Sequence, residues 1–429
     1  MENDHIDIQR PATVRAEIDL PASKSISNRA LILNALSHSE LVPGNLSDCD
    51  DTRVMISALR DMPEVIDIGA AGTAMRFLTA YLSVTPGEHT ITGSARMLQR
   101  PIGVLVDALR QLGAEVRYEG EEGFPPLRIV GRNNLSGGTL RVSANISSQY
   151  LSALLMIAPT LERGLTLVLT GRIVSRPYLE MTIRMMRTFG AQVEWTDEHT
   201  IRVEPGGYRA LPYTIENDWS AASYWYEIVS LTDDPDAQVV LPGLQLHSLQ
   251  GDSCVRDIFA VLGVTTEECT CSDGRKGIRL SKQEGETRHL DYDFTDCPDL
   301  AQTVAVTCAL KEIPYSLSGV ESLRIKETDR LAAVCNELSV LGYRIEASDS
   351  RLAWDGSHTG EEEKISDSIE DSTNEVPAIH TYDDHRMAMA FAPACCRRGT
   401  VRILAPNVVS KSYPTYWEDL KKAGFRVCR

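Results

Sequence analysis

The stretch ALRQLGAEVRY at residues 108–118 decides the fold of this chain, because it joins a helix to a strand through a single glycine. Gly113 directly follows residues with an apolar helical pattern. A glycine just past an amphipathic helix suits a left-handed C-cap, since it adopts a positive φ without a Cβ penalty. Alternating apolar residues after Gly113 indicate a strand. The stretch therefore predicts a helix, a tight turn and a strand in that order.

This pattern recurs along the chain at nearly constant spacing. The further copies are MMRTFGAQVEW (185–195), IFAVLGVTTEE (258–268), NELSVLGYRIEA (336–347) and DLKKAGFRVCR (419–429), and successive glycines are 77, 73, 79 and 82 residues apart. A sixth candidate, MISALRDMPEVIDI (55–68), has Pro63 near the place of the glycine. The period is too long for a solenoid but fits six βαβαββ units of about 70 residues.

A second recurring element is a strand whose small polar or charged end opens a helix rich in Ala, Ser and Leu. It occurs six times, at residues 17–36, 67–82, 140–158, 213–229, 290–310 and 379–394. We expect a polar cap at each helix start. Six units divide into two similar α/β domains of three units each, with the helix starts facing an interdomain cleft. The segments PASK and IEND are plausible crossovers, which puts residues 1–21 and 217–429 in the first domain and 22–216 in the second.

Bulk properties exclude several classes of protein. A chain of 429 residues exceeds the size at which one hydrophobic core stops growing, so two large domains are expected. The net charge of −17 argues against a nucleic-acid or anionic-membrane surface. No apolar run approaches the length of a membrane helix, and the start MENDHIDIQR is too polar and acidic for a secretory signal. We predict a cytoplasmic protein.

Cysteine, histidine and acidic residues give three further predictions. The ten cysteines form no CxxC pair, which favours reduced thiols, and the nine histidines show no ligand spacing, so no metal site is predicted. Residues 355–377 are acidic and poor in large apolar groups, which favours a solvated insertion loop without an assigned function.

Two helix starts in the second domain are candidate anion sites. Lys24, Ser25 and Arg29 surround a strand-to-helix turn and suit a phosphate or carboxylate. The alternative is an ordinary serine cap with exposed cations. Ser147, Ser148 and Gln149 supply two hydroxyls and an amide for a phosphate or for sugar-like hydroxyls. A plain capping run explains them equally well.

The C-terminal half holds candidate residues of both charges. Lys326 and Arg330 are four apart and are expected to share a helix face, with Glu327 about 100° round. An exposed, ion-paired helix start is the alternative. Asp299 follows a proline at the start of an apolar helix and is either a helix cap or a general base near a substrate hydroxyl.

Three more cations lie near helix starts. Arg386 follows two aspartates ahead of an apolar helix, where it either binds a ligand or pairs with an aspartate. Arg100 precedes Pro101, and Lys411 lies in a predicted loop; each is weak by itself.

Nine short motifs occur in one chain order: SKSISNRAL, GTAMR, RPIG, SSQYLSALLM, SRPY, PD, KETDRL, DHRMAM and KSYP. Agreement of nine ordered motifs by chance is negligible, whereas a single one would be weak. Together they resemble the EPSP synthase family of enolpyruvyl transferases over residues 20–417. The resemblance implies two domains of three βαβαββ units each, an inside-out α/β barrel-like fold with an interdomain cleft.

The resemblance also implies an activity. Members transfer the enolpyruvyl group of phosphoenolpyruvate to the 5-hydroxyl of shikimate 3-phosphate by addition and elimination, and they release phosphate. They act in the shikimate pathway of aromatic amino acid biosynthesis and use no metal or organic cofactor. We therefore expect two small-molecule substrates, no nucleic-acid or membrane partner, and a monomer.

Carried over residue by residue, the resemblance implies a set of site residues. Asp299 is the candidate base, Glu327 the proton donor to carbon, and Lys24 an assistant in proton transfer. Shikimate 3-phosphate would contact Lys24, Ser25, Arg29, Ser147, Ser148, Gln149, Ser175, Tyr178, Asp299, Ser322 and Lys326. Phosphoenolpyruvate would contact Lys24, Gly72, Arg100, Gln149, Arg330, Arg386 and Lys411.

Two positions depart from the family pattern. Many members have Asn in place of Ala70, so affinity for phosphoenolpyruvate is expected to be lower here. Ser322 stands where some members have Asn or His.

Two other functions compete with this prediction. The related UDP-N-acetylglucosamine enolpyruvyl transferases have a reactive cysteine shortly before their Arg-Pro, whereas the loop TGSARMLQRP (92–101) has none. A non-catalytic phosphometabolite-binding homologue is the other alternative; retention of Asp299, Glu327 and Lys24 argues against it.

Overall fold

The computed structural model describes residues 4–145, 147–359 and 376–429. The chain divides into two compact units: a first unit of residues 1–21 and 217–429, and a second unit of residues 22–216. Most of the predicted acidic insertion, residues 360–375, lies outside the described residues. Within the described ranges, no helix is long and apolar enough to cross a membrane.

The second unit contains two four-stranded sheets, each with one parallel pair followed by two antiparallel pairings. This is the pattern that a βαβαββ unit produces. In sheet order the strands are β3 (Val65–Asp67), β4 (Gly87–Thr92), β6 (Leu127–Gly131) and β5 (Glu115–Tyr118), and then β7 (Gly138–Ser143), β8 (Leu165–Thr170), β10 (Thr200–Val203) and β9 (Val193–Asp197).

The helices of the second unit alternate with these strands. They are α1 (Lys24–Leu36), α2 (Asp50–Asp61), α3 (Gly72–Ser83), η1 (Met97–Gln99), α4 (Gly103–Gln111), α5 (Ser148–Ile157), η2 (Ala158–Thr160) and α6 (Arg176–Thr188). The repeat that holds α1 and α2 differs from the prediction: in the described part of the chain, its strand pairing includes an isolated bridge between Gly44 and Thr214 in place of a four-stranded sheet.

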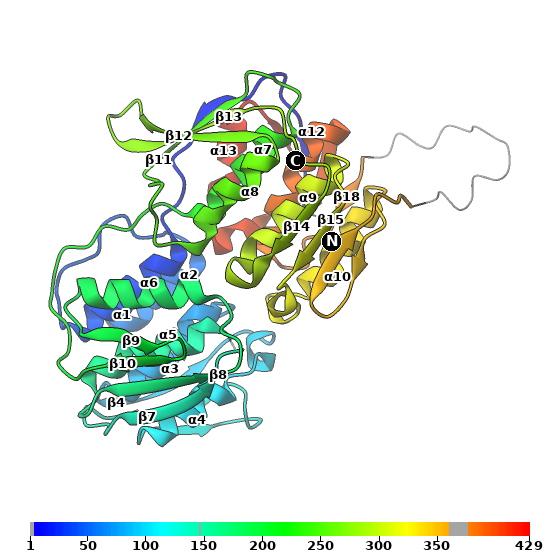
Figure 1. The fold of residues 1–429 in the computed structure, drawn as a ribbon. Helices are drawn as coiled ribbons and strands as arrows, with labels where there is room; N and C mark the ends of the chain where they lie inside the picture. Colours follow the sequence, from blue (N-terminus) through cyan, green and yellow to red (C-terminus); the bar gives the residue numbers. More distant parts are fainter. Residues whose placement is uncertain (1–3, 146, 360–375) are drawn as a thin grey trace. The chain divides into compact units, whose positions relative to one another are not determined.

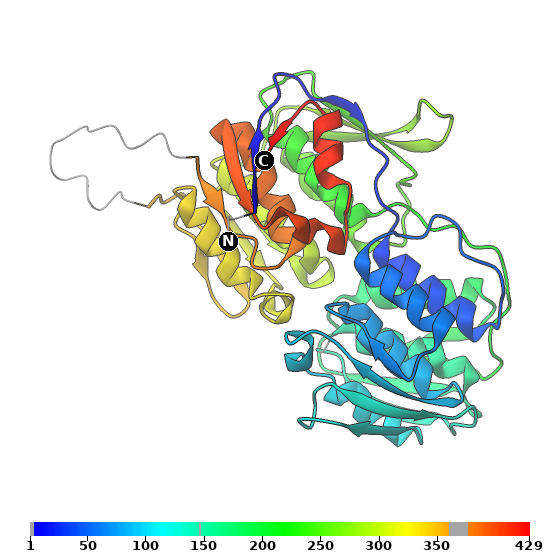
Figure 2. The ribbon, with the colours of Figure 1, turned by 180° about the vertical axis from the view of Figure 1, so that it is seen from behind.

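The first unit contains three four-stranded sheets among its described residues. In sheet order their strands are β2 (Arg15–Glu17), β11 (Gln238–Pro242), β13 (Lys276–Lys282) and β12 (Val264–Thr270); β14 (Leu290–Asp293), β15 (Tyr315–Ser318), β17 (Arg351–Trp354) and β16 (Glu346–Ala347); and β18 (Ala378–Ile379), β19 (Thr400–Leu404), β1 (His5–Gln9) and β20 (Arg426–Cys428). Figure 2 shows β1, in blue, lying with the orange and red strands of the C-terminal end.

Helices of the first unit again alternate with the strands, and α7, α8 and α9 lie side by side in Figure 1. The α-helices are α7 (Trp219–Leu231), α8 (Val255–Val261), α9 (Ala301–Leu310), α10 (Arg330–Val340), α11 (His385–Phe391), α12 (Cys395–Arg398) and α13 (Tyr416–Lys422). The 3-10 helices are η3 (Gly251–Cys254), η4 (Phe294–Asp296), η5 (Pro298–Leu300), η6 (Glu321–Ile325), η8 (Ala392–Ala394) and η9 (Pro406–Lys411).

The core of each unit is formed by the first helix of each repeat. In the second unit α1, α3 and α5 pack on one another, and in the first unit α7, α9 and α11 do so. Every residue of α9 and α11 is buried. A helix that is apolar all round is stable only when protein surrounds it. Helices α9 and α11 are therefore held on every side by the core, which also positions the residues at their N-terminal ends.

The predicted glycine turns are confirmed. Gly113, Gly190, Gly263, Gly342 and Gly424 all have φ between 90° and 98°. At the sixth place Met62, just before Pro63, adopts the left-handed conformation itself with φ of 39° and ends α2.

The expectation of polar caps is correct for four of the six central helices. Side chains of Ser23, Ser147, Asp218 and Asp384 accept hydrogen bonds from the helices that follow them. It is wrong for α3, which begins after Ala71, and for α9, where the 3-10 helix η5 leads into the helix without a side-chain cap.

Candidate functional site

Lys24 and Ser25 open α1 in the second unit, as the sequence predicts for an anion site. The Ser23 hydroxyl accepts from the amide of Ile26 at 3.4 Å. The Lys24 Nζ lies 3.8 Å from the Asp51 carboxylate, an acid that the sequence interpretation did not assign to the site. Backbone N–H groups at a helix start attract anions, and Lys24 adds a positive charge.

Arg29 is a buried cation one turn further along α1, and its side chain is 2% exposed. Its guanidinium donates to the Thr182 and Ser152 hydroxyls at 2.7 and 3.1 Å and to the Ser25 carbonyl at 2.9 Å. Throughout the described ranges, no carboxylate lies within ion-pair distance of it. Burial lowers the pKa of Arg29 to about 10, so the side chain remains charged at neutral pH.

Arg29 also contacts aromatic rings of other elements. Its guanidinium carbon lies 5.3 Å from the Phe77 ring centre and 5.8 Å from that of Tyr178. Tyr178 is on α6, whose N-cap Ser175 has the left-handed φ of 56°. Such backbone strain in a non-glycine residue is typical of ligand sites. Two predicted residues, Arg29 and Tyr178, are therefore in contact.

Gly72 is the first residue of α3 and is in close contact with Arg100. A Cβ atom at residue 72 would lie 2.5 Å from the Arg100 Nη1. The absence of a side chain at Gly72 therefore permits the close approach of the Arg100 guanidinium. The predicted approach of this backbone to phosphoenolpyruvate stays a prediction. Ala70, the departure from the family pattern, is exposed two residues earlier.

Arg76 is a buried residue of this region to which the sequence interpretation gave no role. It donates to the carbonyls of Gly72 at 2.9 Å and Pro101 at 3.5 Å. The Tyr150 hydroxyl also donates to the Pro101 carbonyl. These bonds fix the segment that carries Arg100 against the start of α3. The motif GTAMR contains the signal, since the arginine lies one helical turn after the glycine.

Ser147, Ser148 and Gln149 form the start of α5. The Ser147 hydroxyl caps the helix by accepting from the Gln149 amide at 3.3 Å. The Gln149 side chain donates to the Thr73 hydroxyl at 3.2 Å. The starts of α3 and α5 therefore lie together, and the predicted residues Gly72 and Gln149 belong to one site region.

Asp299 is the centre of a charged cluster in the first unit. Its carboxylate lies 3.2 Å from the Lys326 Nζ, 2.9 Å from the Arg330 Nη1 and 3.1 Å from the Arg386 Nη2. The capping alternative for Asp299 is wrong, because Leu300 occupies the N-cap position of α9. Four predicted residues from three distant segments of the sequence thus meet at one point.

The cluster controls the charge of Asp299. Burial by itself would raise the pKa of this carboxyl, but Arg386, Lys326 and Arg330 outweigh burial and hold the pKa well below its ordinary value. Opposite charges at hydrogen-bond distance favour the ionised form. Asp299 is therefore a carboxylate with little affinity for a proton in this state.

Arg330 is surrounded by carboxylates. It donates to Asp384 at 2.6 Å and to Glu327 at 2.8 Å, in addition to Asp299. The expectation that Lys326 and Arg330 share a helix face is wrong, because α10 begins only at Arg330, with Asp329 as its cap. Lys326 ends η6 in an extended conformation, and the resulting turn directs it to Asp299.

The remaining predicted residues of the first unit lie near the start of α11 or in η6. Tyr382 and Asp383 both have positive φ just before α11, and the Lys411 Nζ donates to the Asp383 carbonyl at 2.5 Å. The Ser322 hydroxyl oxygen is buried and, as far as the structure describes the chain, has no hydrogen-bond partner. Within the described residues this hydroxyl therefore makes no hydrogen bond to Asp299.

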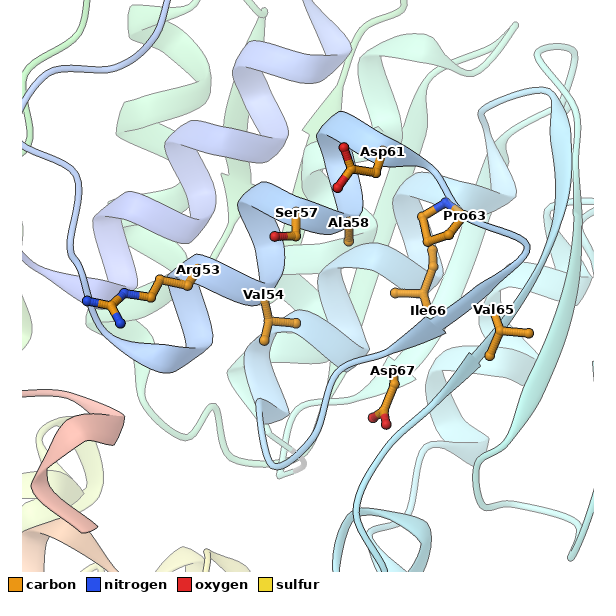
Figure 3. A pocket seen from close by; sticks show the side chains of 9 residues that line it. All are labelled: Arg53, Val54, Ser57, Ala58, Asp61, Pro63, Val65, Ile66 and Asp67. Atoms are coloured by element: carbon orange, nitrogen blue, oxygen red, sulfur yellow. The ribbon is translucent and has the colours of Figure 1, made fainter. Parts of the chain in front are cut away.

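A surface cavity lies apart from these residues. It has a volume of about 360 Å³ and lies between α2 and the segment around β3 (Figure 3). Its lining residues, from Arg53 to Asp67, include none of the predicted site residues. We therefore assign the candidate site to the helix starts and not to this cavity.

The arrangement can bind and react with strongly anionic molecules. Cations and hydroxyl donors gather at the starts of buried helices, and Asp299 lies among the cations as the one predicted base. The fold and site define an α/β protein that binds small phosphate- or carboxylate-bearing molecules.

Comparisons with known proteins identify the family. The family model of EPSP synthase (3-phosphoshikimate 1-carboxyvinyltransferase) matches residues 8–65 and 61–420. The chain belongs to the EPSP synthase family. A 3-phosphoshikimate 1-carboxyvinyltransferase of Bacteroides fragilis is 56% identical over 421 residues, 98% of each chain. One of Ralstonia nicotianae is 37% identical over 446 residues, 96% of this chain and 98% of the relative.

Solved structures agree on the fold. An EPSP synthase structure from Acinetobacter baumannii has a TM-score of 0.76 at 22% identity and covers 99% of this chain and 100% of its own. The family and the α/β fold class predicted from the motifs are thereby confirmed.

Proposed function

We propose that this chain transfers the enolpyruvyl group of phosphoenolpyruvate to the 5-hydroxyl of shikimate 3-phosphate, with release of phosphate. The observation that carries the proposal is the cluster in which Lys326, Arg330 and Arg386 converge on Asp299. The 56% identity to a curated 3-phosphoshikimate 1-carboxyvinyltransferase supports it.

Residues of both units contribute binding groups in this proposal. In the second unit, Arg29 and the hydroxyls of Ser25, Ser147, Ser148 and Ser175 hold shikimate 3-phosphate. A buried guanidinium without a carboxylate partner gains most from a phosphate, because charge-assisted hydrogen bonds are the strong ones. Phosphoenolpyruvate is held by Lys24, Arg100, Gln149, Arg330, Arg386 and Lys411, and Tyr178, Ser322 and Lys326 complete the contacts to shikimate 3-phosphate.

Asp299 acts as the base for the 5-hydroxyl. Its three cationic neighbours keep it a weak base in the ligand-free protein. Substrate phosphate and carboxylate groups compete for the same cations, and as they draw positive charge away, the proton affinity of Asp299 rises. A base is then formed only when the substrates are present.

Glu327 is the proposed donor of a proton to the methylene carbon of phosphoenolpyruvate. It lies beside Arg330, which holds its carboxyl at 2.8 Å. Addition forms the carbon–oxygen bond to the 5-hydroxyl and a new methyl group. Elimination then removes a proton from that methyl group and expels phosphate, which Lys24 helps to stabilise.

Phosphate release from the two substrates together tests the proposal. We expect turnover by the wild-type chain and a loss of about 100- to 10,000-fold in kcat for Asp299→Ala. The absence of phosphate release above background at millimolar substrate would favour the non-catalytic homologue. The monomeric state and the cytoplasmic location stay predictions from the sequence.

A further inference from the structure

Asp252 is a buried carboxyl group to which the proposed reaction assigns no role. It lies in η3 and is 2% exposed. One carboxyl oxygen accepts a hydrogen bond from the Ser220 hydroxyl. The other is buried and has no hydrogen-bond partner among the residues that the structure describes. Burying a charged carboxylate costs free energy, and no ion pair in the described part of the chain offsets that cost for Asp252.

The segment that carries Asp252 is fixed against the start of α7. The Gln250 side chain accepts from the Trp219 amide at 3.1 Å and donates to the Asn217 carbonyl at 2.8 Å. With the bond from Ser220 to Asp252, three side-chain hydrogen bonds join η3 and its N-cap Gln250 to the first turn of α7 and to Asn217, two residues before that helix. Asp252 therefore has little freedom to move away from its neighbours.

The same segment also lies against the one that carries Asp299. Helix α7 packs against both η3 and η5, and the Cys254 and Cys297 side chains lie close enough to influence each other. Cys254 is two residues after Asp252, and Cys297 is two residues before Asp299. The shared packing on α7 therefore places η3 near η5, whatever the charges of Asp252 and Asp299.

The groups that face Asp252 are Asp299 on η5, Arg386 on α11 and Asp218 at the start of α7. Burial and the negative charge of Asp299 raise the pKa of Asp252 to about 6, and Arg386 opposes them. Two carboxyls that interact this strongly titrate as a pair. Because Asp299 keeps its charge through its cations, the proton taken up near neutral pH resides on Asp252.

We propose that Asp252 is a positioning residue of the reaction, one that sets the base strength of Asp299 through its own charge without touching a substrate. The inference rests on the proposed function. Above about pH 6 Asp252 is ionised, and its negative charge strengthens Asp299 as a base. At lower pH Asp252 is neutral, Asp299 becomes a weaker base, and turnover slows.

The test compares Asp252→Asn with the wild type in kcat at saturating substrates, from about pH 5 to about pH 8. The asparagine keeps an oxygen for the Ser220 hydroxyl but never carries charge. The ratio of wild-type to variant kcat should be near one at the acid end and on the order of tenfold at the alkaline end. Titration of the substrate phosphates cancels in this ratio, because both proteins use the same substrates.

A ratio that is constant with pH overturns the inference, since a purely structural role lowers the rate equally at every pH. Asp419→Asn is the matched control. Asp419 is also buried in the first unit, but it pairs with Lys422 and Thr415 and should give a constant ratio. A wild type without phosphate release would refute the proposed function itself, a result that is distinct from a flat ratio.

If Asp252→Asn does not fold, Ser220→Ala tests whether the charge of Asp252 sets the base strength of Asp299. Loss of the hydroxyl removes a bond that favours the ionised carboxyl, so the pKa of Asp252 rises further. The ratio of wild-type to Ser220→Ala kcat should then pass through a maximum above about pH 6 and return towards one at higher pH. A ratio without such a maximum contradicts the inference.

Discussion

Two buried arginines, one in each unit, solve the problem of a buried positive charge in opposite ways. Arg29 is 2% exposed and, among the described residues, its guanidinium donates to two hydroxyls and a carbonyl. Arg330 is 1% exposed and bonds to three carboxylates. Burial lowers the pKa of Arg29. For Arg330 burial acts in the same direction, but the carboxylates outweigh it and raise the pKa.

The difference separates two kinds of anion site. In the proposed function Arg29 is a preformed site, because its charge lacks an acidic counterion in the described chain and a bound phosphate would supply one. The cluster around Arg330 balances Lys326, Arg330 and Arg386 with the acids Asp299, Glu327 and Asp384. In the proposed function a substrate anion competes with these carboxylates for the cations, which couples its binding to the protonation of Asp299.

The largest expected effect is on stability, from Arg330→Gln. This change leaves three carboxylates crowded without their common cation, and we expect a loss of about 3–5 kcal/mol in the free energy of unfolding. Denaturant unfolding measures it. Arg324→Gln is the control, because its pair with Asp329 is partly exposed and should contribute less than about 1 kcal/mol. Equal losses in the two variants would contradict the comparison.

For Arg29→Met we expect the reverse: a small change in stability and a large change in ligand affinity. The variant loses hydrogen bonds to Thr182 and Ser152 but no longer buries a charge, so the free energy of unfolding should change by less than about 1 kcal/mol. Affinity for shikimate 3-phosphate should fall about 100-fold, as expected for the loss of charge-assisted hydrogen bonds. Calorimetric titration and denaturant unfolding of the same sample separate the two quantities. Unchanged affinity would show that Arg29 is structural.

The smallest effect concerns Gly72→Ala. The new Cβ would displace the end of the flexible Arg100 side chain, so stability should be nearly unchanged. The KM for phosphoenolpyruvate should rise about fivefold, equivalent to about 1 kcal/mol. Gly103→Ala is the matched control at the first residue of α4, where a Cβ would find its nearest neighbour at 3.4 Å. A similar rise in KM for both variants would exclude a specific role for Gly72.

Much of the fold can be predicted from the sequence because short local patterns define each repeat. Gly113 and Gly424 mark helix ends wherever they stand, since only a residue that tolerates positive φ ends a helix this way. The starts of α3 and α9 were harder to predict. Ala71 lacks a capping side chain, and Asp299 looks like a cap although its partners are cations elsewhere in the chain.

The site was predictable only where the family motifs name its residues. Asp299 meets Arg330 and Arg386 across 31 and 87 residues, and no local pattern encodes such a pairing. Asp252 and Arg76 were missed for the same reason. Each looks like an ordinary helix residue in the sequence, and only burial against distant partners shows what it contacts.

The position of β1 has a consequence for synthesis on the ribosome. This strand lies between β19 and β20 in its sheet, so residues 5–9 pair with residues 400–404 and 426–428, which are made much later. The second unit, residues 22–216, is complete in sequence long before residues 400–428 emerge. Domains generally fold as units during translation. The second unit can therefore fold first, whereas the first unit must wait with β1 unpaired until β19 and β20 have been made.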